Sequence, residues 1–453
     1  MQDPYALRNK YPEFIYESYT VDNRTDGIHV EYVYRIDQCV FKPTVLIRAS
    51  DIRNEEINRK FLDELFFNFG IINAINYYKL TCSPKFTIKA GTLTAEQREF
   101  FKKLFFYGLG EFMFVNNLAL DYSNFLTIQA EEPAEEKEFN IGHNFSGNLI
   151  TVGGGKDSIV AIEALQSMHD QNLFLQYNRD IYPQNNAALD SIKLAGYSMN
   201  AVTNFNLTLD SLMLELNKKG FYNGHIPFSS CLAFASIIMA YLNNKAYVVL
   251  SNEASANETN IAGQGINHQY SKSFEFENDF QNYIAKYFTD KIYYFSILRC
   301  FNEFQIIQKF LKKPLYLDVF RSCNVGTREN KWCGNCAKCL YVYIMLAPFV
   351  SEEKLVKIFG RNMLQDENLA GMLASLINPD LTKPFECVGT REEIDYALRL
   401  TLEKLTAEGQ ELPKLITYYR DAFFDPNRNY NIEGYFNPQH HIPEEYLKLI
   451  LSL

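Results

Sequence analysis

The sequence has little of what several classes of protein require. Positive charge is in deficit, because 44 Lys and Arg stand against 54 Asp and Glu, a formal net charge of −10. A general binder of nucleic-acid backbones needs a broad basic surface, so this balance argues against that class. It leaves room for a local basic pocket that binds a phosphorylated small molecule. Only one Trp accompanies 36 Phe and 30 Tyr, which we interpret as an aromatic core rather than a base-stacking platform.

Long hydrophobic runs are also missing. The longest apolar stretch, Cys231 to Leu242, is shorter than the about 20 residues that a membrane span needs. Residues 1–4 (MQDP) give no basic start followed by an apolar run, so we expect no signal peptide. These features predict a cytoplasmic protein with reduced thiols and with neither membrane nor nucleic acid among its partners.

Length and pattern predict three units in the 453 residues. Residues 1–140 are expected to form an N-terminal α+β unit, which ends in the acidic segment Glu131 to Glu138. Strand and helix patterns then alternate, which predicts an α/β domain with a parallel sheet over 141–350. Residues 351–453 are expected to be helical.

The predicted elements follow from apolar periodicity. Strands are expected at 30–36, 45–47, 149–152, 174–177, 201–207 and 246–250. Helices are expected near 61–78, 94–106, 231–242, 352–359, 363–376, 391–405 and 443–451. The run at 246–250 is apolar throughout, as in a strand buried on both faces of a parallel sheet.

A glycine-rich loop lies between a predicted strand and a predicted helix. It consists of Gly153, Gly154, Gly155, Lys156, Asp157 and Ser158. Glycines let the backbone bend around phosphate oxygens, and the helix start offers free N–H groups and a positive dipole end. Lys156 can meet phosphate charge, Ser158 can donate a hydrogen bond, and Asp157 suggests Mg²⁺ beside a pyrophosphate. The spacing is not that of a Walker A loop.

The loop closely resembles the Ser-Gly-Gly-x-Asp-Ser loop of N-type ATP pyrophosphatases of the PP-loop superfamily, with Gly153 in place of Ser. The resemblance implies cleavage of ATP between its α and β phosphates and adenylation of an acyl or carbonyl oxygen. Ser251, Asn252 and Glu253 follow the strand at 246–250. Open α/β sheets bind ligands at such strand ends, so we expect these three residues to line the nucleotide or metal site.

Four cysteines are spaced C-x9-C-x2-C-x2-C. They are Cys323, Cys333, Cys336 and Cys339. Four thiolates at this spacing suit a structural, tetrahedral Zn²⁺ site, with an iron–sulfur cluster and free or redox thiols as alternatives. The other cysteines are expected to be ordinary small core residues. These are Cys39, Cys82, Cys231, Cys300 and Cys387.

Basic and titratable residues give further candidates. Four basic residues near the cysteines form a candidate cradle for an anionic substrate. They are Arg321, Arg328, Lys331 and Lys338. Acid/base candidates are His268 and Lys272 in a polar segment, and His225 on a loop before a predicted helix.

Six motifs occur in a specific order. They are GGGKDS, GHIP, SNEASANETN, NHQYSKSFEFE, RSC with WCGNCAKC, and FECVG. Over residues 149–389 the chain resembles the UDP-N-acetyl-α-D-muramoyl-L-alanyl-L-glutamate epimerase family. The resemblance implies that the terminal L-Glu of UDP-N-acetylmuramoyl-L-Ala-L-Glu is inverted to D-Glu for peptidoglycan. It also implies that ATP becomes AMP and pyrophosphate, with Mg²⁺ required.

Chemical logic supports an acyl-adenylate in such a reaction. Adenylation neutralises the α-carboxylate and acidifies the α-carbon, so that a base can remove the proton. Lys156 and Asp157 are expected to serve adenylation. The proton-transfer candidates are His225, Glu253, His268 and Lys272.

Two alternative functions share part of this pattern. One is another PP-loop adenylating enzyme, similar to 7-cyano-7-deazaguanine synthase or to tRNA-thiolating enzymes. The extra N-terminal unit, the helical tail and the net charge weigh against it. The other is a non-catalytic nucleotide-binding regulator, against which the intact glycine loop argues.

Overall fold

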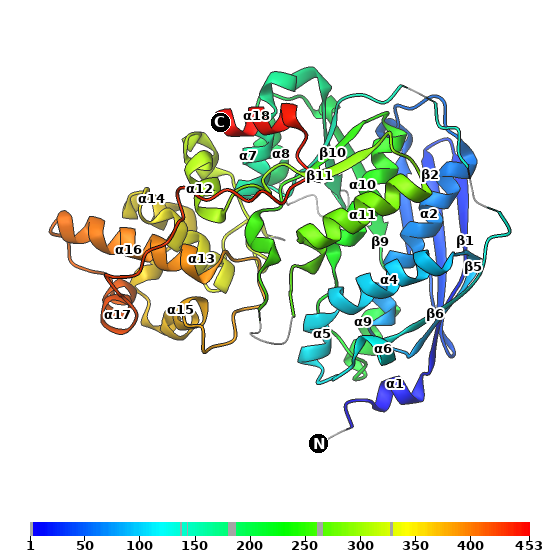
Figure 1. The fold of residues 1–453 in the computed structure, drawn as a ribbon, viewed down its shortest axis with the longest axis horizontal. Helices are drawn as coiled ribbons and strands as arrows, with labels where there is room; N and C mark the ends of the chain where they lie inside the picture. Colours follow the sequence, from blue (N-terminus) through cyan, green and yellow to red (C-terminus); the bar gives the residue numbers. More distant parts are fainter. Residues whose placement is uncertain (1–2, 136–137, 143, 180–186, 261–265, 327–328) are drawn as a thin grey trace.

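Strands from the predicted N-terminal unit and from the predicted α/β domain form one sheet (Figure 1). The computed structural model describes residues 3–135, 138–142, 144–179, 187–260, 266–326 and 329–453. In these residues an 11-stranded sheet has the order β11-β10-β7-β8-β9-β4-β2-β1-β5-β6, with β3 paired to β2. The strands are β1 (Glu13–Arg24), β2 (Gly27–Ile36), β3 (Cys39–Phe41), β4 (Thr44–Arg48), β5 (Lys85–Thr92), β6 (Thr127–Glu131), β7 (Asn148–Thr151), β8 (Asn172–Tyr177), β9 (Val202–Thr208), β10 (Tyr247–Leu250) and β11 (Tyr293–Ser296).

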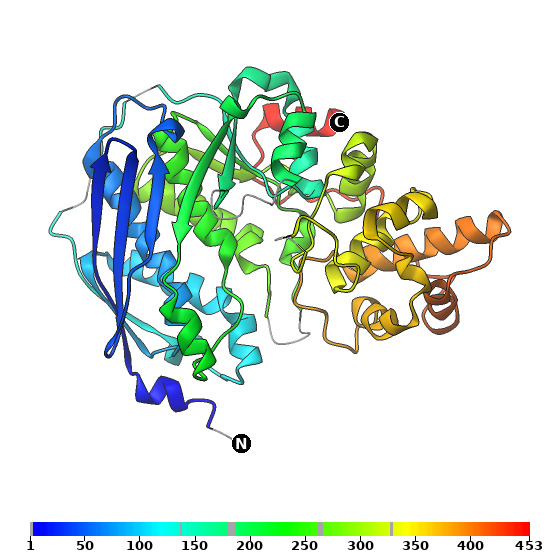
Figure 2. The same ribbon diagram turned by 180° about the vertical axis from the view of Figure 1, so that it is seen from behind.

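Helices cover both faces of the parallel half of this sheet and one face of its N-terminal half, and further helices form a separate group at one side (Figures 1 and 2). Within the N-terminal part they are α1 (Ala6–Lys10), α2 (Arg59–Asn73), α3 (Ile75–Tyr78), α4 (Ala95–Gly108), α5 (Gly110–Val115) and α6 (Tyr122–Phe125). Those that alternate with the parallel strands are α7 (Lys156–Ala164), α8 (Ala187–Leu194), α9 (Leu212–Lys218), α10 (Phe228–Leu242), α11 (Phe274–Tyr287) and α12 (Glu303–Leu311). The remaining helices are α13 (Ala337–Leu346), α14 (Glu352–Phe359), α15 (Ala370–Ile377), α16 (Arg391–Ala407), α17 (Lys414–Ala422) and α18 (Glu444–Ser452).

The parallel half of the sheet has a point where the strand order reverses. Its order is β11-β10-β7-β8-β9, and every neighbouring pair is parallel. The chain therefore runs outward from β7 through β8 to β9, and then returns to the other side of β7 for β10 and β11. Open α/β sheets bind their ligands at such a switch point, outside the carboxyl ends of the strands. The fold therefore points to the ends of β7 and β10 as the place of a ligand site.

Residues that point to opposite faces of these strands enter two different hydrophobic clusters. Leu149 and Val248 lie side by side and belong to the cluster that includes α2, α4, α10 and α11. Ile150 and Val249, the next residues along, belong to the cluster that includes α7, α12 and the C-terminal helices. Burial on both faces explains why the run at 246–250 is apolar throughout, as parallel strands require.

The antiparallel pairing of β4 with β9 joins the two halves of the sheet. Val45 lies opposite Leu207 in this pair. In the N-terminal half, β1, β2 and β4 are antiparallel, whereas β5 and β6 run parallel to β1. The sheet thus continues through the unit expected at 1–140. The divisions at residues 140 and 350 stay predictions.

The C-terminal region is helical, with one departure from the sequence expectation. The helix expected over 363–376 is interrupted, because two short 3-10 turns precede α15. The side chains of Asn362 and Asp366 accept hydrogen bonds from the backbone N–H groups of Leu364 and Asn368. Such local bonds compete with a continuous helix.

The final helix returns to the parallel strands. In Figure 1, α18 (red) lies beside α7, away from α16 and α17 (orange). Tyr446 of α18 donates a hydrogen bond to the side chain of Asn148 in β7 and packs against Tyr247. None of the described helices combines the length and the apolar character needed to cross a membrane.

Candidate active site

The glycine-rich loop leaves the carboxyl end of β7 and begins α7 at the switch point. Gly154 has φ +83°, and a Cβ there would lie 2.6 Å from the backbone N of Ala188, so only glycine fits. The Gly154 N–H donates to Ser158 Oγ (3.2 Å), and the Ser158 hydroxyl donates to the Gly155 carbonyl (2.9 Å). The first N–H groups of α7 have no carbonyl of their own helix to bind, which makes this end suited to an anion.

Lys156 is part of a buried ion-pair group. Its ammonium donates to the carboxylates of Asp157 and Glu303, and the side chains of Lys156 and Glu303 are 2% and 1% exposed. Burial opposes the charge on Lys156, but the carboxylates of Asp157, Glu303 and Glu253 raise its pKa above the ordinary lysine value. Asp157 is 24% exposed. The loop therefore presents the Asp157 carboxylate, while its lysine is paired inside.

Glu253 lies at the other side of the switch point, after β10. The residue is buried, and its backbone carbonyl accepts a hydrogen bond from Arg299 (2.7 Å). Arg299 is itself held by a buried ion pair with Glu277 (2.8 Å). The neighbouring Asn252 amide donates to Ser296 at the end of β11 (3.1 Å). Ser251 is half-buried at the same strand end. The three residues expected from the sequence thus line the end of β10.

Lys272 connects the glycine loop to the helical region. Its ammonium contacts Sγ of Cys387 at 3.2 Å. Burial opposes its charge, but Cys387, Glu253 and Asp157 raise the pKa of Lys272. From α13, the Lys338 ammonium donates to the Cys387 backbone carbonyl. Two cations therefore approach one half-buried cysteine.

Cys387 corrects a sequence expectation. The sequence placed it with the ordinary core cysteines, and the structure places it half-buried among charged side chains. Cys82, Cys231 and Cys300 are buried, as expected. Lys272 and Cys387 are 115 positions apart in the sequence, so no local spacing signals their contact.

Two histidines share one carboxylate. Nδ1 of His268 is hydrogen-bonded to Oε2 of Glu111, and Nδ1 of His225 lies 3.7 Å from the same oxygen. Their ring centroids are 4.2 Å apart. Burial, with help from nearby cations, lowers the pKa of His225 to about 3. Burial opposes protonation of His268 as well, but Cys387 and Glu111 raise its pKa to about 9. At neutral pH, His225 is thus neutral and His268 carries a proton.

The structure brings the sequence candidates into two adjoining groups. Lys156, Asp157, Glu253 and Lys272 form a charged cluster at the ends of β7 and β10. His225 and His268 form a second group. Cys387 joins the two, because both Lys272 and His268 contact it.

Three contributors were missed by the sequence reasoning. Glu303 begins α12 after β11, a strand that the sequence pattern did not predict. Glu393 of α16 accepts the Glu303 N–H (2.6 Å), and burial raises its pKa to about 7. Glu111 comes from α5 in the N-terminal part, which carries no motif. Only the fold places these side chains together.

Of the basic residues near the cysteines, two reach this site. Lys338 does so through Cys387, and the Arg321 backbone N–H donates to the Gly154 carbonyl (2.8 Å). Nε of Arg321 is buried and has no hydrogen-bond partner among the described residues. Lys331 is largely exposed and pairs with Glu329. Arg328 lies outside the described residues.

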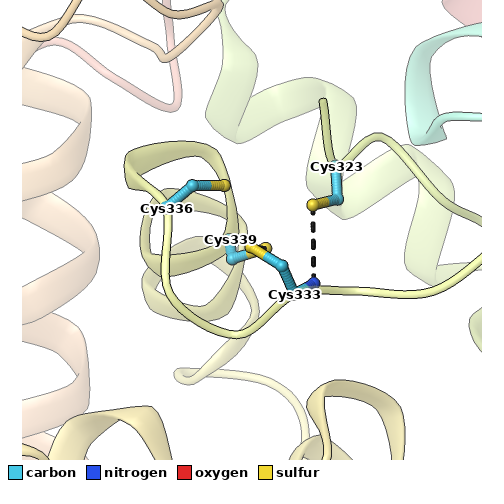
Figure 3. Close-up of side chains that lie close together, drawn as sticks. All are labelled: Cys323, Cys333, Cys336 and Cys339. Carbon is cyan, nitrogen blue, oxygen red and sulfur yellow. Dashed lines mark hydrogen bonds between the residues drawn. The ribbon is translucent and has the colours of Figure 1, made fainter. Parts of the chain in front are cut away.

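The four cysteines expected to bind metal converge on one point (Figure 3). Their sulfur atoms all lie within 4.8 Å of one another, and Cys333 Sγ is 3.6 Å from Cys339 Sγ. Four thiolates at about 2.3 Å from Zn²⁺ would be about 3.8 Å apart, so the donor set fits a tetrahedral zinc site. Backbone N–H groups of Gly326 (3.1 Å) and Cys333 (3.4 Å) donate to Cys323 Sγ, which favours its thiolate form.

Comparison with known proteins gives a consistent result. The family model for the MurL N-terminal domain matches residues 6–297, and the model for the MurL C-terminal domain matches residues 319–422. Three similar relatives are each named UDP-N-acetyl-alpha-D-muramoyl-L-alanyl-L-glutamate epimerase. The one from Xanthomonas oryzae pv. oryzae is 33% identical over 368 residues, 79% of this chain and 78% of the relative.

The relative from Salinispora tropica is 31% identical over 86% of this chain and 85% of its own length. The one from Micromonospora sp. is 30% identical over 86% of this chain and 87% of its own. Among solved structures, a lactate dehydrogenase from Eimeria maxima with NADH and oxamate covers 69% of this chain and 92% of its own. Its TM-score of 0.18 and 11% identity support no argument.

Proposed function

The chain belongs to the MurL family of UDP-N-acetyl-α-D-muramoyl-L-alanyl-L-glutamate epimerases, and on that premise we propose that it is an isomerase of peptidoglycan synthesis. Its substrate is UDP-N-acetylmuramoyl-L-Ala-L-Glu, whose terminal L-Glu becomes D-Glu. The observation that carries this proposal is the match of both family models together with similarly named relatives over 79–86% of the chain.

The finer proposal is that ATP activates the glutamyl carboxylate as an acyl-adenylate, releasing pyrophosphate and then AMP. The glycine loop at the β7–β10 switch point supports this, because its backbone N–H groups suit the phosphates. Arg321, whose backbone N–H donates to the Gly154 carbonyl, also has a buried Nε without a hydrogen-bond partner among the described residues. These features also favour placing the fold in the PP-loop superfamily.

Asp157 and Glu253 are the residues that would hold Mg²⁺. Carboxylate oxygens are the ligands this ion prefers, and Asp157 is partly exposed at the loop. When bound, Mg²⁺ would offset negative charge on the phosphates. Lys156 keeps both Asp157 and Glu303 in place through its buried contacts.

The need for activation follows from the substrate. Its glutamyl nitrogen is already an amide, so it cannot form a Schiff base with an aldehyde cofactor. Removing the α-proton of a carboxylate would place a second negative charge on the same group. Adenylation removes the first charge, and the α-proton becomes acidic enough for a side-chain base.

The protonation states divide the proton-transfer candidates. Lys272 and His268 carry protons at neutral pH and serve as acids or as electrostatic partners of an enolate. His225 is neutral, because its pKa is about 3, and has a free electron pair. Glu253 lies beside the proposed nucleotide and is the fourth candidate.

The cysteine cluster completes the proposal as a structural Zn²⁺ site. Its segment contacts the glycine loop through the Arg321–Gly154 hydrogen bond. Zinc bound there would fix the position of this segment against the loop. It takes no part in the chemical step.

The test is an incubation of the chain with ATP, Mg²⁺ and UDP-N-acetylmuramoyl-L-Ala-L-Glu. The readouts are AMP, pyrophosphate and the configuration of the glutamate after the product is hydrolysed for the assay. We expect AMP, and D-Glu only when ATP is present. An Asp157→Asn variant should form much less AMP. AMP without inversion would assign the chain to a different adenylating reaction, and D-Glu without ATP would refute the acyl-adenylate. Absence of both products with folded protein would refute the proposed function.

A further inference from the structure

We propose that Cys387 is the base that removes the α-proton of the adenylated glutamyl group. The inference rests on the proposed function. It adds a catalytic residue from the helical region, where the sequence predicted only a core cysteine. The observation that carries it is the convergence of cationic side chains from separate segments on one half-buried sulfur.

The surroundings of Cys387 are built to hold an anion. Lys272 contacts Sγ at 3.2 Å, and His268 is hydrogen-bonded to the same thiol. Behind His268 stands the Glu111 carboxylate, which fixes the imidazole. Lys338 binds the Cys387 backbone carbonyl and so orients the loop. A reactive thiol is usually paired with a histidine, and a carboxylate orients that histidine.

Cysteines elsewhere in the chain show the contrast. Burial raises the pKa of Cys82 to about 11 and that of Cys231 and Cys300 to about 12. Burial acts in the same direction on Cys387, but Lys272, His268 and Lys338 lower its pKa to about 6. Cys387 is thus a thiolate at neutral pH, as reactive cysteines are.

The charged groups that face this thiol come from several elements. Lys272 lies in the 3-10 turn before α11, His268 lies just before that turn, and Lys338 lies in α13. Negative charge is near but engaged elsewhere: Glu111 binds His268, and Glu386 accepts the Lys338 backbone N–H at 2.9 Å. The balance of the groups in contact with sulfur is therefore positive.

Cys387 lies close to the residues that we propose for adenylation, which suits a role in proton transfer. The ammonium of Lys272, which contacts the sulfur of Cys387, also interacts electrostatically with the carboxylates of Asp157 in the glycine loop and of Glu253 after β10. The two candidates that approach the thiol, Lys272 and His268, already carry protons. Lys272 and His268 therefore cannot accept one at neutral pH, whereas the thiolate can.

Cys387 acts as a general base on the acyl-adenylate. A lone pair on Sγ takes the α-proton, and the electron pair of the C–H bond moves to form the enolate of the acyl-adenylate, whose negative charge rests on the former carbonyl oxygen. A second acid or water delivers a proton to the opposite face, which inverts the carbon. Cys387 leaves the step as a thiol and returns its proton to solvent, and water then cleaves the acyl-adenylate to product and AMP.

The first test compares Cys387→Ser with Cys39→Ser, a matched control at another partly buried cysteine, on β3. Adenylation is followed by ATP–pyrophosphate exchange, and proton removal by deuterium entering the α-carbon in D₂O. We expect Cys387→Ser to lose deuterium exchange by about 100-fold or more while adenylation continues. The control should keep both activities. Normal deuterium exchange in Cys387→Ser, or an equal loss of both activities, would overturn the proposal.

A second test uses the wild-type chain and needs no variant to fold. The rate of iodoacetamide alkylation at Cys387 is measured against pH by peptide mapping. We expect a midpoint near pH 6. A midpoint near the ordinary cysteine value of about 8.5 would refute a thiolate base.

The outcomes also separate this proposal from its premise. Wild-type protein that forms no AMP with this dipeptide would refute the proposed function and this role with it. Wild-type protein that inverts glutamate, together with Cys387→Ser that still exchanges the α-proton, would refute Cys387 alone. A substrate-derived thioester on Cys387 in quenched wild-type protein would show that the thiolate acts as a nucleophile, and would also overturn the base role.

Discussion

Replacing Glu303 by Gln tests whether the glycine loop is held by a buried ion pair. The side chains of Glu303 and Lys156 are 1% and 2% exposed, so neither charge is solvated by water. Removing one partner of a buried pair destabilises a protein by about 3–5 kcal/mol. Lys156 keeps Asp157, so we expect the lower end of that range, about 3 kcal/mol.

The expected shift can be converted to a temperature. At about 2.1 cal/mol/K per residue, a cooperative unfolding of this chain has an entropy of about 1 kcal/mol/K. The melting temperature of Glu303→Gln should therefore fall by about 3 °C in differential scanning calorimetry. AMP formation should fall as well, because Asp157 becomes the main partner of Lys156. Glu367→Gln is the matched control, since its pair with Lys414 is 70% and 55% exposed, and it should leave the melting temperature unchanged.

A pH series sharpens this test. Burial and the neighbouring Glu303 raise the pKa of Glu393 to about 7. The folded state thus binds a proton that the unfolded state has released, and its contribution to stability is lost as pH rises from about 4.5 through 7. Without the Glu303 charge, this decline should be smaller. An unchanged melting temperature in folded Glu303→Gln would show that Glu303 is already neutral, and the ion-pair reasoning would fail.

Three further predictions concern the rest of the site. Gly154→Ala should lower the free energy of unfolding by about 1–3 kcal/mol, because Gly154 has a positive φ and a Cβ there would meet α8. Gly153→Ala, where a Cβ would meet open space, should leave the free energy of unfolding unchanged, and equal effects would refute the steric argument. The purified chain should hold one zinc ion by elemental analysis, and Cys336→Ser should lose both the metal and thermal stability; metal-free wild-type protein of full stability would refute a structural zinc site. In the wild-type chain, the stability that protonated His268 contributes should be fully present below about pH 6.5. It should be lost as the pH rises towards about 9, because His268 then loses its proton. Glu111→Gln should lower the pKa of His268 and flatten that decline, and an NMR titration of His268 with no change in pKa would contradict the Glu111 contact.

Local patterns predicted the parts of the fold that depend on neighbouring residues. Apolar runs predicted β7, β8 and β10, and apolar periodicity predicted α4, which the structure shows to begin after a capping box at Thr94. The glycine loop and the four cysteines are compact motifs, so the position of the loop between a strand and a helix predicted a phosphate site and the spacing of the cysteines predicted a zinc site. The 3-10 turns before α15 were missed, because side-chain caps at Asn362 and Asp366 outweigh apolar periodicity.

The residues that could not be predicted are those that approach one another only through the fold. Glu303 reaches Lys156 because β11 pairs with β10 at the edge of the parallel sheet, and the sequence did not reveal that strand. Cys387 reaches Lys272 because the C-terminal helices pack over the strand ends. Glu111 reaches the histidines from the N-terminal half of the sheet. None of these contacts leaves a periodic or spaced signal in the sequence.

The same geometry explains why the site needs more than the parallel sheet. The groups that we propose for adenylation lie on the glycine loop and at the end of β10, where open α/β sheets bind ligands. Proton transfer, in our proposal, uses Cys387 from the region matched by the C-terminal domain model and Lys272 from the region matched by the N-terminal one. Glu111, which holds His268, comes from the N-terminal half of the sheet. An α/β domain alone would supply the loop that activates a carboxylate but not the thiolate and its cations, so inversion is expected only where all three parts of the chain meet.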